Sequence, residues 1–157
     1  MNREINFRAW DKEKKEWYKP IHEAYKGNLS ELMLGFKGDI LEHNINGITH
    51  ESVFPDRYEL NQYTGLKDKN GVEIYEGDII KVLDRDWCDM EKDTKTLIVY
   101  FDKGSFLLIS KAGITERESD NPDIYNKDWV EVKIWKEYGR DRFEVIGNIY
   151  QNPDLIK

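Results

Sequence analysis

The sequence predicts a mostly β fold made of antiparallel strands joined by tight turns. Aromatic residues make up 13% of the chain, and their large flat side chains pack well on pleated surfaces. Runs in which apolar and polar residues alternate recur along the chain, and this period of two is typical of half-buried strands. Clusters of Gly, Asn and Asp between the runs indicate turns. The 157 residues predict one domain, with room for an N-terminal lobe at about 1–55 and a C-terminal barrel lobe at about 56–157.

The N-terminal run "REINFRAWD" alternates and predicts the first strand. One face of this strand would carry Ile5, Phe7 and Ala9, and the other face Arg8 and Trp10. We expect "KEWYKP" to pair with the strand as a hairpin across a charged tip at 11–15. Pro20 would then close the strand edge, because proline lacks the N–H group that a ladder needs.

Residues 29–48 fit two different structures. The run could form one helical turn at 30–34 with Ser30 as its N-cap, or two short strands separated by Gly35 and Gly38. The pattern alone leaves both structures open.

The central stretch "QYTGLKDKNGVEIYEGDIIKV", residues 62–82, is dense in turn formers. Gly65 and the tetrapeptide at 68–71 favour turns, because Asn and Gly adopt positive φ at little cost. The run "VEIYEGDIIKVLD" then predicts a strand, a tight turn at 76–78 and a second strand that is apolar on both faces, as a central barrel strand would be.

The clearest hairpin lies in "TLIVYFDKGSFLLISK". Its two β-rich runs, 96–101 and 105–110, are joined by three residues that place Gly104 in the left-handed position of a bulged turn.

Further downstream, the runs 129–135 and 142–150 predict another antiparallel pair joined at Gly139. The tail "QNPDLIK" predicts a short helical turn with Asn152 as N-cap and Pro153 in the first helical position. Two acidic, polar segments at 84–95 and 112–128 remain, and we expect them to form long surface loops.

Composition restricts the classes of partner and compartment. The net charge of −7 opposes non-specific binding of nucleic acid. A single cysteine, Cys88, excludes an internal disulfide and a cysteine-rich zinc site. The start "MNREINFRAW" lacks the apolar segment of a signal peptide, and no run is long and apolar enough to cross a bilayer. We therefore expect a cytoplasmic protein with no membrane contact.

No motif in the chain predicts a catalytic residue, a cofactor or a metal. In the acidic loop, Asp84 and Asp86 match the first and third positions of a calcium loop, but its sixth position lacks glycine and its twelfth lacks glutamate. The three histidines, His22, His43 and His50, do not have the spacing that places two of them on one helix face with a glutamate between them, so a metalloprotease-like site is not predicted. Cys88 has acidic neighbours, which oppose thiolate formation.

Three blocks of the chain together resemble the YopX family of phage and prophage proteins from Gram-positive hosts. These blocks are "INFRAWD" at 5–11, "LNQYTGLKDKNGVEIYEGDIIKV" at 60–82 and "FEVIGNIYQNPDLI" at 143–156. The positions that carry the resemblance are Phe7, Arg8, Trp10, Asp11, Tyr63, Thr64, Gly65, Leu66, Asp68, Gly71, Ile74, Tyr75, Glu76, Gly77, Asp78, Ile79, Gly147, Asn148 and Pro153.

The resemblance implies a pseudo-barrel of bent antiparallel strands with long loops and minor helical turns. It implies no established activity and supplies no catalytic residue. Because the matching positions coincide with predicted turns and strands, we expect them to have a structural role. The resemblance also implies a phage-encoded protein that forms homo-oligomers.

Three hypotheses for function follow. The first is a non-enzymatic accessory protein that self-associates and binds a host or phage macromolecule through the loops at 84–95 and 112–128. The second is a small barrel that binds nucleic acid through the lysine and aromatic cluster at 12–19. The third is an enzyme, for which the first residues to test would be Tyr63, Asp68, Tyr75, Glu76 and Asp78.

Overall fold

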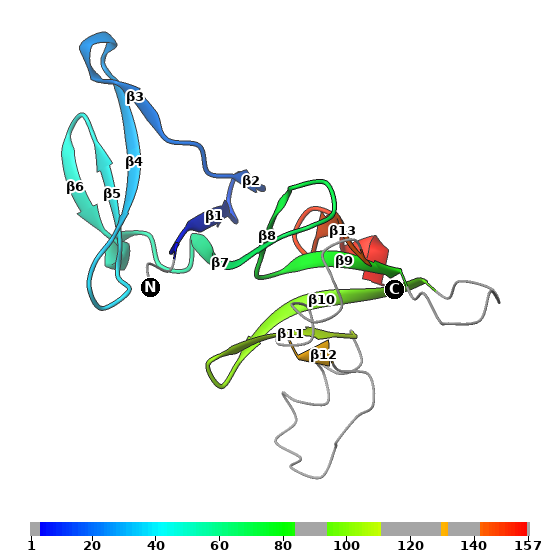
Figure 1. Cartoon of the computed structure of the whole chain (residues 1–157). Helices are drawn as coiled ribbons and strands as arrows, with labels where there is room; N and C mark the ends of the chain where they lie inside the picture. Colours follow the sequence, from blue (N-terminus) through cyan, green and yellow to red (C-terminus); the bar gives the residue numbers. More distant parts are fainter. Residues whose placement is uncertain (1–3, 84–93, 111–129, 132–141, 157) are drawn as a thin grey trace, which may run out of the picture. The chain divides into compact units, whose positions relative to one another are not determined.

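The structure, a computed structural model, describes residues 4–83, 94–110, 130–131 and 142–156. It is mostly β, as the sequence predicts, with antiparallel strands and, among the described residues, only short 3-10 helical turns. The chain divides into two compact units, which are described separately: residues 8–60 form one, and residues 1–7 together with 61–157 form the other. Figure 1 shows the order of the elements along the chain.

The unit of residues 8–60 contains a four-stranded antiparallel sheet in the order β3-β4-β5-β6. Its elements are β3 (Ile21–Glu23), the 3-10 turn η1 (Ala24–Lys26), β4 (Asn28–Leu34), β5 (Ile40–Asn44), β6 (Gly47–His50) and the 3-10 turn η2 (Glu51–Val53). Of the two structures that the sequence leaves open for 29–48, the strands are therefore the one that forms. The chain between β4 and β5 turns at Gly38, whose φ of 90° suits glycine.

The register of this sheet decides which side chains share a face. Glu31 on β4 lies opposite His43 on β5, and His43 lies opposite Ile48 on β6. Three residues along, Leu34 pairs with Ile40, which is buried. Because successive side chains point to opposite faces, the Ile40 face is the core face and the Glu31 face is the opposite one.

The core of this unit lies against the Ile40 face. Ala9, Ile40 and Tyr58 form its buried centre, and the partly buried residues that pack on it are Tyr18, Leu32, Phe54 and Leu60. The aromatic rings meet edge to face: the Phe54 and Tyr18 ring centroids lie 5.6 and 5.8 Å from that of Tyr58.

The N-terminal strand β1 (Phe7–Asp11) and β2 (Glu16–Trp17) form the expected hairpin, with Trp10 opposite Trp17. They belong to a sheet of order β2-β1-β7-β8, whose other members are β7 (Tyr58–Lys67) and β8 (Glu73–Tyr75). The expected alternation of β1 is wrong, because Ala9, Trp10 and Asp11 are all buried in succession, whereas Phe7 is 44% exposed.

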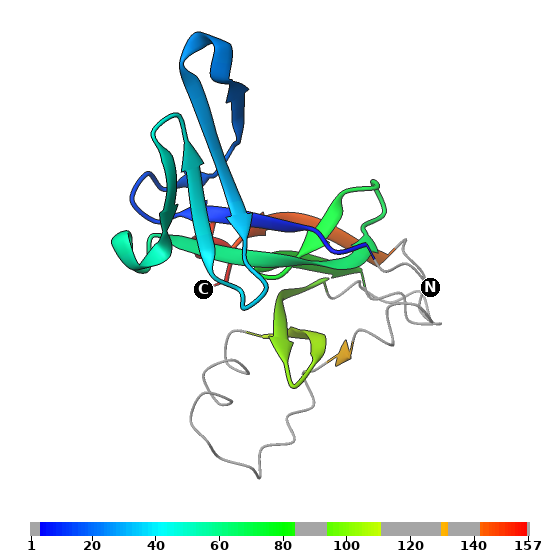
Figure 2. The same ribbon diagram turned by 90° about the vertical axis from the view of Figure 1, so that its left-hand side faces the viewer.

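The unit of 1–7 and 61–157 contains a five-stranded antiparallel sheet that curls into a half-barrel, in the order β12-β11-β10-β9-β13. Its strands are β9 (Asp78–Leu83), β10 (Thr94–Asp102), β11 (Ser105–Ile109), β12 (Val130–Glu131) and β13 (Phe143–Asn148). The core is apolar and comes mainly from this sheet: Ile74, Ile80, Leu97, Val99, Phe106, Leu108 and Phe143. Figure 2 shows β9 and β13 side by side, in agreement with their register.

Two of the predicted hairpins form as expected and one pair does not. The β10–β11 hairpin is present, but its turn contains two residues, Lys103 and Gly104, which both have positive φ as a primed turn requires, so no bulge occurs. The expected pairing of 129–135 with 142–150 is wrong for the described residues: β12 pairs with β11, and β13 pairs with β9. The Gly139 turn and most of the segments 84–95 and 112–128 lie outside the described residues.

The C-terminal helical turn η4 (Pro153–Ile156) forms where the sequence predicts it. The Asn152 carboxamide oxygen accepts a hydrogen bond from the backbone N–H of Asn148 at 3.3 Å, so it points back to β13. Nowhere in the described ranges does the chain form a helix with the length and apolar character that a membrane span needs.

Candidate functional site

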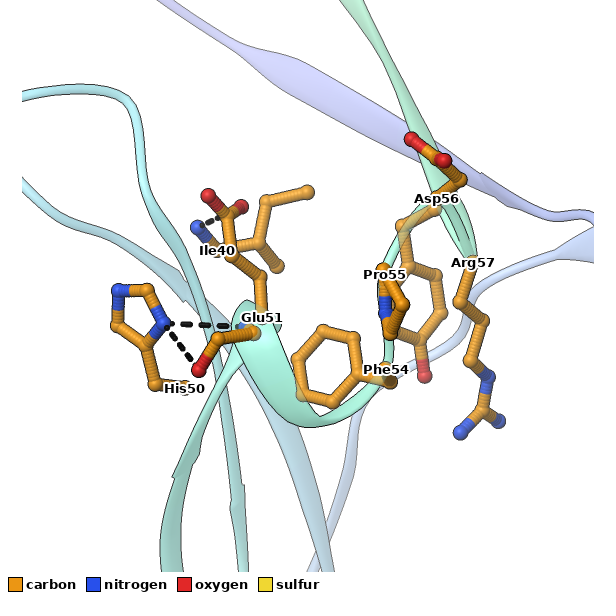
Figure 3. A pocket seen from close by; sticks show the side chains of 9 residues that line it. Ile40, His50, Glu51, Phe54, Pro55, Asp56 and Arg57 are labelled. Carbon is orange, nitrogen blue, oxygen red and sulfur yellow. Dashed lines mark hydrogen bonds between the residues drawn. The ribbon is translucent and has the colours of Figure 1, made fainter.

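A pocket of about 330 Å³ lies in the unit of residues 8–60, beside the chain that leads from β6 through η2 into β7 (Figure 3). The side chains that line it are Ile40, His50, Glu51, Ser52, Phe54, Pro55, Asp56, Arg57 and Tyr58. The N-cap of η2 fixes the local geometry, because the His50 ring accepts a hydrogen bond from the backbone N–H of Ser52 at 3.1 Å. The lining combines apolar side chains, such as Ile40 and Phe54, with charged ones.

Arg57 is the positively charged residue of the lining. Its guanidinium donates to the Asp11 carboxylate at 2.9 Å and lies 3.4 and 3.7 Å from the carboxylates of Glu13 and Glu42. Burial by itself would lower the pKa of Arg57, but the hydrogen bond with Asp11 and the nearby negative charges raise it. Three carboxylates therefore compensate this guanidinium, and the pocket does not present it as a site for an anionic ligand.

The phenol of Tyr58 forms part of the pocket wall. Burial first, and then the negative charge of Glu42, raises the pKa of Tyr58 to about 12. The phenol therefore keeps its proton near neutral pH and cannot act there as a general base.

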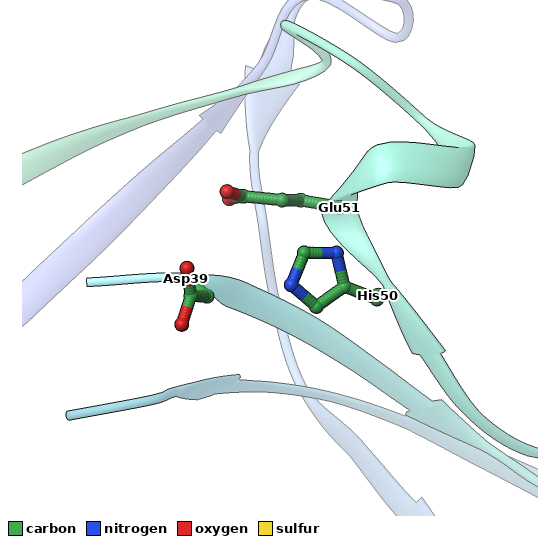
Figure 4. A group of neighbouring side chains, drawn as sticks. All are labelled: Asp39, His50 and Glu51. Carbon is green, nitrogen blue, oxygen red and sulfur yellow. The ribbon is translucent and has the colours of Figure 1, made fainter. Parts of the chain in front are cut away.

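Asp39, His50 and Glu51 gather at one side of the pocket, with their potential ligand atoms within 4.8 Å of one another (Figure 4). Glu51 already accepts a hydrogen bond from the backbone N–H of Ile40 at 2.8 Å. Because Nδ1 of His50 accepts the Ser52 N–H, the proton of the neutral ring is on Nε2. An Nε2 that carries a proton donates to a carboxylate and does not bind a metal, so the trio favours a hydrogen-bonded network.

A different surface of this unit is apolar and open. We call it the distal end: the end of the β3–β6 sheet at which the turns after β3 and after β5 both lie (Figures 1 and 2). Its large apolar side chains are Ile21, Tyr25, Ile45 and Ile48, which are exposed by 46%, 82%, 58% and 62%. Across the sheet, Ile21 lies opposite Ser30, Ser30 lies opposite Asn44, and Asn44 lies opposite Gly47, the residue before Ile48.

The predicted site residues of the central block lie in the other unit, where Asp68 connects two segments that are far apart in the sequence. Its carboxylate accepts hydrogen bonds from the backbone N–H groups of Asn70 and Val72 at 2.8 and 2.9 Å and from that of Val145 at 3.1 Å. Asp68 is buried. It thus ties the turn between β7 and β8 to β13, which lies 77 residues further along the chain.

Asp78 is buried at the start of β9 and makes a separate network. It accepts hydrogen bonds from the backbone N–H of Tyr75 at 2.8 Å and from the side-chain amide of Asn148 at 3.2 Å. Asp68 and Asp78 therefore bind different backbone segments and do not form a carboxylate pair. Glu76 lies in the turn with Gly77, where its backbone N–H donates to the Gln62 carbonyl.

The remaining positions of the motif lie in strands and turns. Ile74 and Ile79 are fully buried, and the Tyr63 and Tyr75 rings are 5.4 Å apart. The Thr64 hydroxyl donates to the Ile74 carbonyl, and its oxygen accepts the N–H of Leu66. Positive φ angles occur at Gly65, Gly71 and Gly77, whereas Gly147 lies in close contact with Asn152 and Pro153 begins η4. In the other unit, Arg8 lies over the Trp17 ring, beside Trp10 and Asp11 on β1.

The pocket and the distal end were missed by sequence reasoning. Both depend on the 29–48 segment, which the pattern left open between helix and strands. The signal for the distal end was present in the exposed position of Ile45, one residue before "NG", because an apolar residue in a hairpin turn has no core to enter.

Comparisons with known proteins match this architecture. The model of the YopX protein family matches residues 6–157. The crystal structure of protein EF1440 from Enterococcus faecalis is similar, with 25% sequence identity, a TM-score of 0.53 and coverage of 99% of this chain and 100% of that one. The crystal structure of protein yopX from Bacillus subtilis shares the fold at 21% identity and a TM-score of 0.55, over 96% and 97% of the two chains. No curated protein matches.

The curled antiparallel sheet and the central block of turns define a mostly β protein of the pseudo-barrel class. Because the family model matches nearly the whole chain, this chain belongs to the YopX family.

Proposed function

We propose that this protein is a non-enzymatic accessory protein of phage or prophage origin, which acts in the host bacterial cytoplasm, associates with itself and binds a host or phage macromolecule. The observation that carries the proposal is the distal end of the β3–β6 sheet. Four large apolar side chains are exposed at this end, with Ile21 and Ile48 on opposite faces of the sheet, in a unit that otherwise has a compact core of its own. Exposed apolar groups gathered in this way are typical of surfaces that another protein covers.

The edges of the same sheet support self-association. β3 and β6 are its outer strands, and within the described part of the chain no further strand pairs with either of them. Open strand edges favour pairing with another chain, and a second copy of the same protein can cover both an edge and the apolar distal end in one symmetric contact. The segments at 84–95 and 112–128, which lie mostly outside the described residues, remain our candidates for contacting the other macromolecule.

The state of the charged groups argues against catalysis at the pocket. Hydrogen bonds to neighbouring residues already engage the side chains of Arg57, His50 and Glu51. The raised pKa of Tyr58 keeps its phenol neutral. Asp68 and Asp78 bind backbone N–H groups in the other unit. These carboxylates and rings therefore act as structural ties and lack the paired geometry of an acid and a base.

Nucleic-acid binding through residues 12–19 receives less support. Lys12 is paired with Glu59 at 2.7 Å, the Trp17 ring packs against Trp10 at 5.2 Å, and the Tyr18 hydroxyl bonds to Ser30. The aromatic rings are thus used inside the protein and are not available to stack on bases. We expect no mobility shift with single- or double-stranded nucleic acid even at low salt, where phosphate contacts are strongest.

Size-exclusion chromatography with light scattering tests the self-association. The wild-type protein should elute as an oligomer, and the double variant Ile45→Asp/Ile48→Asp should elute as a monomer, because both changes place charge on the distal end. The matched control is Phe36→Asp, which changes a fully exposed aromatic residue at the opposite end of the same sheet. A wild-type monomer at all concentrations, or equal loss of the oligomer in the control, would refute the proposed surface.

Co-isolation from host lysate tests the second part of the proposal. Wild-type protein should retain a specific macromolecule that a version with 112–128 replaced by a short Gly/Ser linker fails to retain. Retention of the same species by both versions, or of none by the wild type, would count against the binding role of that segment.

A further inference from the structure

We propose that His22, Glu31 and His43 form a binding site for a first-row divalent transition metal, with Zn²⁺ as the ion that the donor set fits best. The site lies on the open face of the β3–β6 sheet, opposite to the core of that unit. It is separate from the pocket and borders the distal end at Ile48, which lies opposite His43, and it does not rest on the self-association proposed above.

The register of three neighbouring strands brings the three side chains to one face. His43 on β5 lies directly opposite Glu31 on β4. His22 on β3 lies opposite Leu29, which is two residues before Glu31 on the same strand and therefore points to the same side. A carboxylate thus stands between two imidazoles that come from the strands on either side of it.

The distances place both rings around this carboxylate. His22 Nε2 lies 3.7 Å from Oε1 of Glu31, and His43 Nδ1 lies 3.9 Å from Oε2. These separations are too long for hydrogen bonds. In a tetrahedral zinc site, with metal–ligand bonds of 2.0–2.1 Å, the nitrogen and oxygen ligands are about 3.3 Å apart. The two present distances end on different oxygens of Glu31, and no choice of one donor atom per residue places all three within 4.8 Å of one another. Rotation of the side chains must therefore bring the two rings together around the carboxylate before a metal is bound.

The three side chains are available for such a rotation. Their exposed fractions are 61% for His22, 42% for Glu31 and 36% for His43. Among the described residues, no other hydrogen bond or ion pair engages these side chains, so each ring can present its lone pair to a metal. This differs from His50, whose Nδ1 is occupied by the Ser52 N–H.

The donor set selects the class of ion. Two imidazoles and one carboxylate are the ligands of open zinc sites, in which a water molecule or an external ligand takes the fourth position. Ca²⁺ and Mg²⁺ prefer oxygen ligands alone, so two nitrogen donors disfavour them. The backbone of three paired strands also holds the ligands on a rigid scaffold, which lowers the cost of ordering them.

Calorimetric titration of Zn²⁺ into the full-length, tag-free protein tests the site, with Co²⁺ as a spectroscopic probe. We expect one ion per chain and the intense visible absorption of tetrahedral Co²⁺. His22→Ala, His43→Ala and Glu31→Gln should each weaken binding by about tenfold or more, since losing a direct ligand costs at least as much as losing a supporting residue. His50→Ala is the matched control and should leave the affinity unchanged.

His22 is exposed, and Glu31 and His43 are half-buried on the face away from the core, so the variants should keep the wild-type circular dichroism spectrum and melting curve. Absence of binding at millimolar Zn²⁺ would overturn the proposal. Binding that survives in both His22→Ala and His43→Ala would also overturn it, because the ion would then belong to other residues. Loss of binding in the His50→Ala control alone would move the site to Asp39, His50 and Glu51 and equally reject the present assignment.

Discussion

The carboxylate of Asp11 and the guanidinium of Arg57 meet at 2.9 Å, although the two residues are 46 positions apart in the sequence. The Asp11 side chain is 2% exposed and also accepts hydrogen bonds from the backbone N–H groups of Glu13 and Lys14. It therefore holds together the β1–β2 hairpin and the start of β7. Glu13 approaches the same guanidinium at 3.4 Å, but its side chain is 70% exposed.

These two carboxylates give a matched pair of stability predictions. Asp11→Ala should lower the free energy of unfolding by about 3 kcal/mol, because it takes from a largely buried guanidinium its nearest and most buried partner. Glu13→Ala should lower it by less than about 0.5 kcal/mol, because an exposed ion pair contributes little. Urea denaturation measures both values. Similar losses in the two variants would contradict the difference that burial predicts.

Tyr58 predicts a loss of stability at alkaline pH. Its folded-state pKa of about 12 lies above the ordinary value of 10.0, so its contribution is fully present below pH 10 and is lost as the pH rises toward 12. Tyr58→Phe should lack this part of the decline in unfolding free energy, which amounts to about 2 kcal/mol at the alkaline end of the range. Denaturant unfolding between pH 9 and 12 measures it, with Tyr25→Phe as the exposed control. Parallel pH profiles for wild type and Tyr58→Phe would be inconsistent with the raised pKa.

Asp68 predicts a local change in hydrogen exchange. In Asp68→Asn one carboxylate oxygen becomes an NH₂ group, so the side chain can no longer accept from both the turn and the Val145 N–H. We expect the N–H of Val145 to exchange faster and the protein to lose about 1–3 kcal/mol of stability. Amide exchange followed by NMR tests this, and the N–H of Gly77, which bonds to the Val99 carbonyl, serves as the internal reference. If the Val145 N–H exchanged no faster in Asp68→Asn, its hydrogen bond to the Asp68 carboxylate would not be what protects it from exchange.

Gly147 predicts a steric coupling with Asn152. A Cβ atom at position 147 would lie 2.7 Å from Oδ1 and 3.0 Å from Cβ of Asn152. Gly147→Ala should therefore destabilise the protein by about 1–3 kcal/mol, the usual cost of overpacking. In the Gly147→Ala/Asn152→Gly double variant the clash is gone, so the two losses should be clearly less than additive in thermal or urea unfolding. Strict additivity would exclude the contact as the cause.

Local sequence signals predicted most of the strands and turns. The turns at Gly71, Gly77 and Gly104 depend on residues that adopt positive φ, and this is a property of the residues themselves. The alternating runs then define the strands between the turns. For these features the chain needs no information from distant positions.

Partners across long sequence distances could not be predicted in the same way. The expected pair of 129–135 with 142–150 failed because β13 bonds to β9, where Val145 faces Ile80 in the main core. Adjacent strands in sequence are the usual partners, but apolar burial decided this case. The burial of three successive β1 residues also has a non-local cause, since the ion pair with Arg57 takes Asp11 inside.

The candidate metal ligands illustrate the same limit. His22, Glu31 and His43 have no spacing that any motif describes, and they come together only through the register of three strands. Because the sequence left a helical turn open at 30–34, no face could be assigned to Glu31. Pairing of Glu31 with His43 was therefore visible only in the structure.

The chain passes from one unit to the other at two places, after Phe7 and after Leu60. These places lie on β1 and β7, which are neighbours in one sheet, and the Tyr63 N–H bonds to the Asn6 carbonyl beside them. The segment of residues 8–60, with its own core, thus has the topology of an inserted domain whose ends are close together. We expect that this insertion can be exchanged for that of another family member while the half-barrel keeps its fold, so that chimeras can assign each activity to one unit.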